Sequence, residues 1–253
     1  MNRLQDKVIV VAGAGGIGDE LARRYTGEGA AVVLGDIDGD RAIATAETIA
    51  ATGAACIGTL LDGGDEGSIR AAIDLAVGRF GGLDGLHANY AGFNDNDSLH
   101  DVTTIPMEDF DDVMRVGSRG FVLCTRHAIP EMLKRGGGSL VYTSSDAAFM
   151  GEVVRLAYAM SKVSMHALAR HVAHRFGPQG IRANVICPGV VTHPRFEAAL
   201  PAEIVEAFTD STLLGRLGRP VDIAAMAALM MSDEGSYITG QVISVNGGAL
   251  MRP

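Results

Sequence analysis

Short apolar runs alternate with helical patterns along almost the whole chain, and this alternation limits the fold more than any other feature. The runs are Val8–Val11, Ala31–Leu34, Ser139–Tyr142, Ala183–Cys187 and Gln241–Val245. Such runs are typical of strands buried on both faces of a sheet. Between them, one helical stripe joins Ile69, Ile73, Ala76, Val77 and Phe80, and another joins Ile223, Ala227 and Met230. Strands that alternate with helices pair in parallel through right-handed crossovers, so we expect an α/β protein with a doubly wound, mostly parallel sheet flanked by helices.

The alternation continues without a break, which predicts a single domain over residues 1–253. No linker rich in Pro or Ser interrupts it, and the 33 glycines are scattered between apolar runs in a way that favours turns over disorder. We interpret residues 192–215 as a longer loop excursion over one edge of the sheet.

The charge balance argues against binding to nucleic acid. Thirty acidic residues against 21 Lys and Arg give a net charge of -9, and a surface that negative repels a phosphate backbone. No stretch approaches the roughly 20 apolar residues of a membrane span, and residues 1–11 hold no long apolar segment behind a basic start. We therefore expect a cytoplasmic protein with no membrane or nucleic-acid partner.

Three cysteines, Cys56, Cys124 and Cys187, lie far apart, and each lies in or beside an apolar run. Their odd number and wide spacing argue against a disulfide framework or a zinc site. We predict buried, reduced thiols and no bound metal.

A glycine-rich turn joins the first expected strand to the first expected helix. The turn is Gly13-Ala14-Gly15-Gly16-Ile17-Gly18, and the helical stretch Asp19–Gly27 follows it. Glycines at such a junction let the backbone approach a pyrophosphate, and the helix amino end adds unpaired N–H groups and a favourable dipole. Glycine turns also serve plain packing, but this position in the chain favours a dinucleotide site. The predicted contacts in the turn are Gly13, Gly15, Gly16, Ile17 and Gly18.

An acidic residue, Asp36, ends the second expected strand 18 residues beyond Gly18. A carboxylate at this place accepts hydrogen bonds from both hydroxyls of an adenosine ribose and repels the extra phosphate of NADP. No Arg or Lys follows before Arg41, so nothing nearby in the sequence compensates that phosphate. We predict NAD as the cofactor, with Asp36 and Ile37 at its adenosine end; a solvated Asp in a turn is the alternative.

A tyrosine and a lysine four residues apart form the candidate catalytic pair. Tyr158 and Lys162 share one face of an expected helix that runs from Ala157 towards Arg175. A nearby ammonium lowers the pKa of a phenol and makes it a general acid/base near neutral pH. The spacing alone occurs often in surface pairs, but here Ser145 ends a strand 13 residues before Tyr158, and the combination with the glycine turn is far more specific.

In these motifs the chain resembles the short-chain dehydrogenase/reductase family over essentially its whole length. Asn89-Tyr90-Ala91-Gly92 resembles the family's Asn-Asn-Ala-Gly segment, and Asn184–Gly189 resembles its Asn-x-x-x-Pro-Gly stretch beside the nicotinamide. Gly215–Pro220 and Tyr237–Gly248 resemble its carboxy-terminal segments. The resemblance implies one Rossmann-type domain. The cofactor contacts that it adds are Leu61, Asp62, Asn89, Ala91, Gly92, Tyr158, Lys162, Pro188, Gly189, Val191 and Thr192.

The same resemblance implies an NAD(H)-dependent oxidoreductase that interconverts a secondary alcohol, or a cyclic diol, and its ketone. Tyr158 would exchange the proton of the substrate hydroxyl while a hydride passes to or from the nicotinamide. Lys162 would hold the nicotinamide ribose and depress the pKa of the tyrosine. Ser145 would donate a hydrogen bond to the reacting oxygen. An enoyl reductase fits less well, because those relatives space their Tyr and Lys further apart.

The turn departs from the family pattern in two ways. Ala12 stands where the family usually has Thr, so a hydroxyl that braces the turn is missing. Two residues, Ala14 and Gly15, separate Gly13 from Gly16 where three are typical.

A third departure is Gly117, which aligns with the family's catalytic Asn. That Asn anchors a water that connects Lys162 to solvent, and glycine has no side chain to do so. We expect a backbone carbonyl and an additional water to complete the relay, since glycine leaves room for one. The alternative is an NAD-binding sensor or assembly subunit with weakened catalysis.

The fourth departure is His193, which stands where the family has a Thr that contacts the nicotinamide amide, with Thr192 one place early. Either side chain can hydrogen-bond the amide, and the sequence does not choose between them.

Substrate contacts are expected from the loops Phe93–Leu99, Asp146–Leu156 and Thr192–Gly215. Their apolar candidates are Phe93, Phe149, Met150, Phe196 and Leu200, and their polar candidates are Asn94, Glu152, Arg155 and Arg195. This mixture suits an apolar or cyclic alcohol or its ketone. By resemblance we also expect a homotetramer assembled through helices over about 106–135 and 157–177 and through the final segment.

Overall fold

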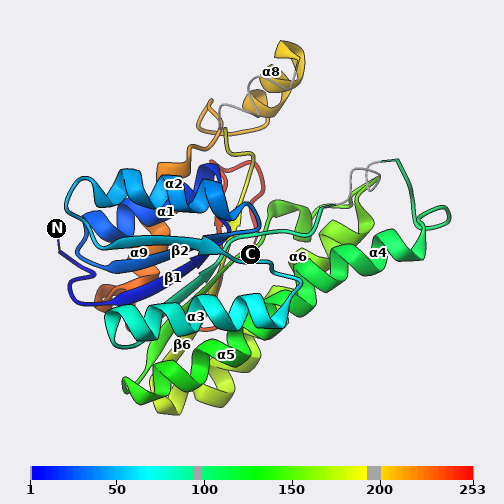
Figure 1. Cartoon of the computed structure of the whole chain (residues 1–253). Helices are drawn as coiled ribbons and strands as arrows, with labels where there is room; N and C mark the ends of the chain where they lie inside the picture. The colour runs from blue at the N-terminus through cyan, green and yellow to red at the C-terminus, as the bar shows by residue number, and fades with distance from the viewer. Residues whose placement is uncertain (1, 94–98, 193–200, 253) are drawn as a thin grey trace.

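The structure is a computed structural model of the chain and describes residues 2–93, 99–192 and 201–252. These residues form a seven-stranded sheet in the order β3-β2-β1-β4-β5-β6-β7, and each pair of neighbouring strands is parallel. Helices cover both of its faces (Figure 1). The expected doubly wound α/β fold is confirmed, and the sheet is wholly parallel.

The strands are β1 (Val8–Ala12), β2 (Ala31–Asp36), β3 (Cys56–Leu60), β4 (Gly85–Ala88), β5 (Gly138–Thr143), β6 (Ile181–Pro188) and β7 (Val242–Val245). Four of them contain the apolar runs identified above, and β7 contains the fifth run except for Gln241. The strands β3 and β4 were not predicted. β3 lies at the edge of the sheet and is only partly buried, while β4 is four residues long and contains Gly85 and His87.

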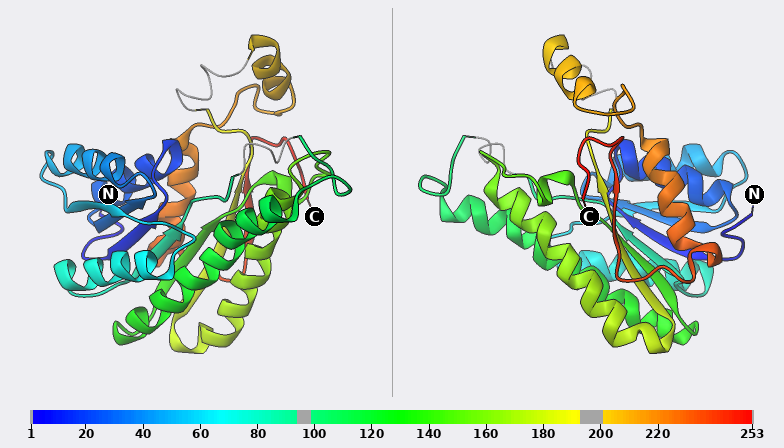
Figure 2. Two further views of the ribbon diagram at one scale, coloured as in Figure 1. Left: turned by 45° about the vertical axis from the view of Figure 1, so that its right-hand side comes forward. Right: turned by 180° about the vertical axis from the view of Figure 1, so that it is seen from behind.

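Two layers of helices enclose the sheet. The helices are α1 (Gly16–Gly27), α2 (Gly39–Ala50), α3 (Glu66–Phe80), α4 (Met107–Met114), α5 (Gly120–Lys134), α6 (Leu156–Phe176), α8 (Ala202–Asp210) and α9 (Pro220–Met231). One buried cluster joins the sheet to α3, α5 and α6, and a second joins it to α1, α2 and α9. Figure 2 shows the green α5 and yellow-green α6 on one side of the sheet and the blue α1 and orange α9 on the other. In the described part of the chain, no helix has both the length and the apolar character that crossing a membrane requires.

The helix expected over about 106–135 is interrupted. A π-helical turn, Arg115–Arg119, separates α4 from α5, and Gly117 lies buried within it. The excursion expected over 192–215 contains α8, which projects away from the two helix layers (Figure 1), and residues 193–200 of it lie outside the described residues.

The topology places the carboxyl ends of the central strands at one edge. The strand order reverses between β1 and β4. The chain continues from β1 to β2 on one side of this pair, and from β4 to β5 on the other. Ligands of doubly wound sheets bind in the crevice at such a switch point. The turns after β1, β2, β4, β5 and β6 all open there.

The first of these turns depends on close packing by Gly18. A Cβ on Gly18 would overlap the carbonyl oxygen of Gly13 and reach within 3.2 Å of Nδ2 of Asn89. We therefore expect Gly18→Ala to lower the free energy of unfolding by roughly 2 kcal/mol or more.

Gly27, at the other end of α1, provides the control because nothing lies within 4 Å of its Cβ position. Gly27→Ala should leave stability unchanged or raise it by up to about 1 kcal/mol. Urea denaturation of both variants measures the difference. Equal stabilities would contradict the packing role of Gly18.

Candidate active site

A cavity of about 430 Å³ lies at the switch point, and segments from five strand ends line it. The predicted site residues that line it are Gly13, Gly16, Ile17, Asp36, Ile37, Asn89, Ala91, Ser145, Tyr158, Lys162, Pro188, Gly189 and Val191. The structure therefore brings the three candidate catalytic side chains and most candidate cofactor contacts into one cleft.

Six predicted contacts are not among the residues that line the cavity: Gly15, Gly18, Leu61, Asp62, Gly92 and Thr192. Gly15 and Gly18 belong to the turn itself. The Thr192 hydroxyl donates to the carbonyl of Gly218 at 3.3 Å. His193, the alternative to Thr192, lies outside the described residues, as do Asn94, Arg195, Phe196 and Leu200.

Four residues that line the cavity were missed by the sequence analysis: Ala14, Tyr90, Thr143 and Ser144. A fifth, Phe93, was expected only as a contact of the substrate. Each is adjacent to a predicted site residue or lies at the end of a strand. Their places after β1, β4 and β5 were the available signal, because the strand ends of a parallel sheet share one edge.

The glycine turn has the backbone that a phosphate site requires. Gly13 and Gly15 have φ angles of 100° and 101°, which favour glycine. Together with Gly18 they give the G-x-G-x-x-G spacing of a dinucleotide-binding turn, in which the third glycine allows close packing of helix and strand. The shorter turn therefore retains the necessary features.

Three side chains brace the turn in place of the missing hydroxyl at Ala12. The N–H of Ala14 donates to Oδ2 of Asp36 at 2.8 Å, and the N–H of Gly15 donates to Oδ1 of Asp19 at 3.1 Å. Nδ2 of Asn89 donates to the carbonyl of Gly13 at 3.1 Å. Two carboxylates and one amide thus fix the backbone of the turn.

The cleft fits a dinucleotide on two independent observations. Among the described residues no side chain caps the amino end of α1, so the N–H groups of its first turn remain available for a phosphate. Oδ1 of Asn89, a residue that lines the cleft, is buried and has no hydrogen-bond partner in the described part of the chain. A buried acceptor without a partner costs free energy, and a bound ligand would satisfy it.

Tyr158 lies in the first turn of α6 at the wall of the cleft. The ring of Phe93 stacks on it, with centroids 5.3 Å apart and planes inclined by 17°. Burial raises the pKa of the Tyr158 phenol, whereas a hydrogen bond with Ser145 and the charge of Arg155 act in the opposite direction. The phenol is therefore protonated at neutral pH in this state.

The ammonium group of Lys162 is buried and held by backbone carbonyls. Nζ donates to the carbonyl of Thr143 at 2.9 Å and to that of Tyr90 at 3.3 Å. Burial lowers the pKa of Lys162 to about 7, because the charged form is desolvated. Its third proton is left for a ligand.

The expected effect of Lys162 on the pKa of the tyrosine stays a prediction. Nζ of Lys162 lies 5.6 Å from the Tyr158 ring centroid, and its hydrogen bonds are made to Thr143 and Tyr90. The pKa of the phenol is raised chiefly by its own desolvation.

A buried network supports the strand end that holds Lys162. Nδ1 of His87 lies 2.7 Å from the hydroxyl of Tyr25, and Nε2 lies 2.8 Å from Oγ1 of Thr143. Burial lowers the pKa of His87 to about 3, so the ring is neutral. The network fixes the Thr143 side chain, and the carbonyl of the same residue accepts from Lys162.

Gly117 packs closely against Ser161 of α6. Its Cβ position lies 2.8 Å from Oγ and 2.9 Å from Cβ of Ser161, so the Ser161 side chain fills the place of a side chain at 117. The relay through a backbone carbonyl and an additional water stays a prediction. Glycine at 117 is a packing requirement of the contact between the π-helical turn and α6.

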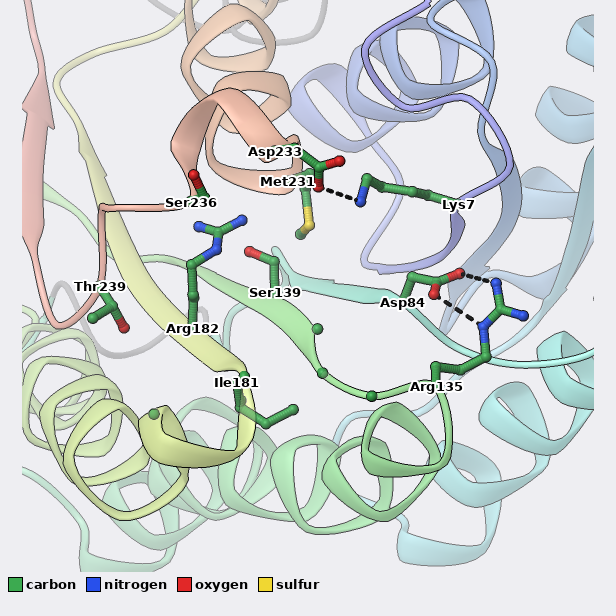
Figure 3. A pocket seen from close by; sticks show the side chains of 15 residues that line it. Lys7, Asp84, Arg135, Ser139, Ile181, Arg182, Met231, Asp233, Ser236 and Thr239 are labelled. Carbon is green, nitrogen blue, oxygen red and sulfur yellow. Dashed lines mark hydrogen bonds and ion pairs between the residues drawn. The ribbon is translucent and has the colours of Figure 1, made fainter.

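A slightly larger cavity, of about 450 Å³, lies at the opposite edge of the sheet (Figure 3). Lys7 pairs with Asp233 there, Arg135 pairs with Asp84, and Arg182 donates to backbone carbonyls. These charged groups satisfy one another, and the cavity contains none of the candidate catalytic residues.

A family model described as enoyl-(acyl carrier protein) reductase matches residues 11–249. An uncharacterized oxidoreductase of Mycobacterium tuberculosis is 38% identical to the chain, over 97% of this chain and 98% of the relative. A probable short-chain type dehydrogenase/reductase of Bradyrhizobium diazoefficiens is 37% identical, over 99% of this chain and 89% of the relative. A 2,5-dichloro-2,5-cyclohexadiene-1,4-diol dehydrogenase of Sphingobium indicum is 33% identical, over 98% of this chain and 97% of the relative.

The buried amine of Lys162 predicts a specific dependence of stability on pH. Between its pKa of about 7 in the folded protein and about 10.4 in the unfolded chain, the unfolded chain binds more protons, so the free energy of unfolding rises with pH. Relative to Lys162→Met, the wild type should gain roughly 3 kcal/mol between pH 7 and pH 10. Parallel pH profiles from denaturant unfolding of the two proteins would contradict the buried amine.

The packing of Gly117 predicts that the family's residue is not tolerated. Gly117→Asn should lower the free energy of unfolding by about 1–3 kcal/mol because the new side chain collides with Ser161. Gly78→Asn is the control, since Gly78 is exposed in α3 with nothing within 4 Å of its Cβ position. Thermal unfolding compares them, and an unaffected Gly117→Asn would refute the packing requirement.

Proposed function

The chain belongs to the short-chain dehydrogenase/reductase family, and on this basis we propose that it is an NAD(H)-dependent oxidoreductase that interconverts a secondary alcohol, or a cyclic diol, and its ketone. The observation that carries this proposal is the convergence of Ser145, Tyr158 and Lys162 on the cleft that fits a dinucleotide. A hydroxyl, a phenol and an ammonium group there surround the space in which a carbon–oxygen bond would react.

The three side chains have separate tasks in the proposed reaction. A bound nicotinamide would supply or accept the hydride. The Tyr158 phenol gives its proton to the carbonyl oxygen in reduction, and its phenolate takes the hydroxyl proton in oxidation. Ser145 donates a hydrogen bond to the same oxygen and stabilises its developing charge. Lys162 offers its third proton to the ribose and stabilises the phenolate.

Asp36 supports the assignment of NAD as the cofactor. Its carboxylate lies in the cleft and accepts from the N–H groups of Ala14 and Asp38, at 2.8 and 3.0 Å. A carboxylate has about four lone-pair sites, so two remain for the hydroxyls of a ribose. Its negative charge opposes a 2′-phosphate.

The apolar surface beside Tyr158 supports an apolar, cyclic substrate. Phe93 stacks on Tyr158 and is 73% exposed, and Met150 and Val153 are exposed in the loop after β5. Arg155 of the same loop forms an ion pair with Glu152 at 3.1 Å. The similarity to a cyclic diol dehydrogenase points in the same direction, and NAD use favours the oxidative direction.

Exposed apolar residues support the expected assembly. Val122 on α5 and Met160 and Val163 on α6 are 44–49% exposed, and they lie on the helices through which we expected subunits to associate. A homotetramer built on α5 and α6 would cover them.

Two alternatives compete with an alcohol dehydrogenase. The family model carries the name of an enoyl reductase, and such an enzyme would reduce a carbon–carbon double bond. A sensor or assembly subunit would bind NAD without efficient turnover. The packing that requires Gly117 weakens the support for the second alternative, because the absence of Asn at 117 has a structural reason.

A screen of NAD reduction across cyclic alcohols, dihydrodiols and hydroxysteroids tests the proposal, with NADP and an enoyl thioester plus NADH run alongside. We expect at least one cyclic alcohol or diol to reduce NAD. Tyr158→Phe should lower kcat by about 10²- to 10⁴-fold, because the proton donor is lost.

Tyr237→Phe is the matched control, since Tyr237 is fully exposed on the surface and should keep wild-type turnover. Unchanged turnover in Tyr158→Phe would refute the proposed chemistry. NADH binding without turnover of any alcohol would favour the sensor, and turnover of the enoyl thioester alone would favour the enoyl reductase.

A further inference from the structure

Three charged side chains meet around the second and third residues of the glycine turn. The N–H of Ala14 donates to Asp36 and the N–H of Gly15 donates to Asp19. The guanidinium of Arg41, from the first turn of α2, lies 3.5 Å from the Cβ position of Gly15. The sequence suggested that Arg41 was too distant to matter, but the fold brings it against the turn.

Asp19 holds Arg41 in this place. Nη2 of Arg41 donates to Oδ2 of Asp19 at 2.9 Å, while Oδ1 of Asp19 accepts from Gly15. Both side chains are partly exposed, at 29% and 25%. One carboxylate thus braces the turn and neutralises the arginine.

The position of Arg41 is significant for coenzyme choice. In a dinucleotide-binding turn the adenosine ribose lies beside the acid that ends β2, which is Asp36 here. A 2′-phosphate on that ribose would enter the region between Asp36 and Arg41. An arginine fork is the side chain best suited to bind a phosphate, provided that it is not already engaged by a carboxylate.

We propose that Asp19 is a second determinant of coenzyme choice, because it engages the Arg41 guanidinium that would otherwise bind the 2′-phosphate of NADP(H). This inference rests on the proposed function of the cleft. Asp36 excludes the phosphate by its charge, and Asp19 withholds the cation that would compensate it. Together the two carboxylates and the guanidinium leave a net charge of −1 around the turn.

Calorimetric titration with NADH and with NADPH tests the proposal without any substrate. Asp19→Asn removes the charge but keeps an oxygen that accepts from the N–H of Gly15, so the turn should remain intact. We expect the affinity of Asp19→Asn for NADPH to rise by about tenfold, the scale of one charge-assisted contact, with that for NADH changed less than about twofold.

Two further variants isolate the role of Arg41. Glu20→Gln removes a neighbouring charge from the same helix turn, and Glu20 forms no ion pair within the described residues. It should raise the affinity for NADPH by less than about twofold. In the double variant Asp19→Asn with Arg41→Gln, the gain of Asp19→Asn should disappear.

An equal gain in Asp19→Asn and Glu20→Gln would overturn the inference, because it would show a general charge effect. A gain that persists without Arg41 would overturn it as well. If the wild type binds neither NADH nor NADPH, the proposed function fails and this inference fails with it.

Discussion

The site depends on one buried ammonium group that is held by two backbone carbonyls. Lys162 donates to Thr143, at the end of β5, and to Tyr90, just after β4. The two strands are neighbours in the sheet, so their parallel register sets the separation of the two carbonyls. The same lysine stands four residues after Tyr158 on α6, so the position of its amine relative to the phenol follows from the fold. A desolvated cation is costly, and the sheet edge offsets part of that cost by offering carbonyl dipoles.

At the glycine turn, two carboxylates hold the backbone in place. Asp36 and Asp19 each accept from one N–H group of the glycine turn, and they replace the bracing hydroxyl that Ala12 lacks. Carboxylates near a phosphate site oppose the anion they help to position, so their charge must be balanced. Arg41 pairs with Asp19, whereas Asp36 keeps the uncompensated charge that we assign to the ribose end of the cofactor. The side chains that brace the turn are therefore the same ones to which we assign the choice of coenzyme.

The sequence predicted those parts of the fold that depend on local patterns. Apolar runs such as Val8–Val11 correctly predicted buried strands. The strand β3 was missed because it lies at the edge of the sheet and is half exposed. The strand β4 was missed because it has only four residues, among them Gly85 and His87, and so contains no apolar run. The candidate catalytic residues were placed by their spacing on one helix and at one strand end. Contacts between distant segments left no local signal: neither the approach of Arg41 to Gly15 nor the contact of Gly117 with Ser161 follows from spacing. The hydrogen bonds of Lys162 likewise had no local signal, because they depend on carbonyls at the ends of β4 and β5.

The most direct measurement of the central claim is the titration of Lys162 by NMR of the carbon-13-labelled lysine side chains. The chain has three lysines, Lys7, Lys134 and Lys162, so each resonance can be assigned with one substitution. An amine buried against two carbonyls should titrate near the lowered pKa of about 7. A midpoint close to the ordinary value for lysine, about 10.4, would contradict the account.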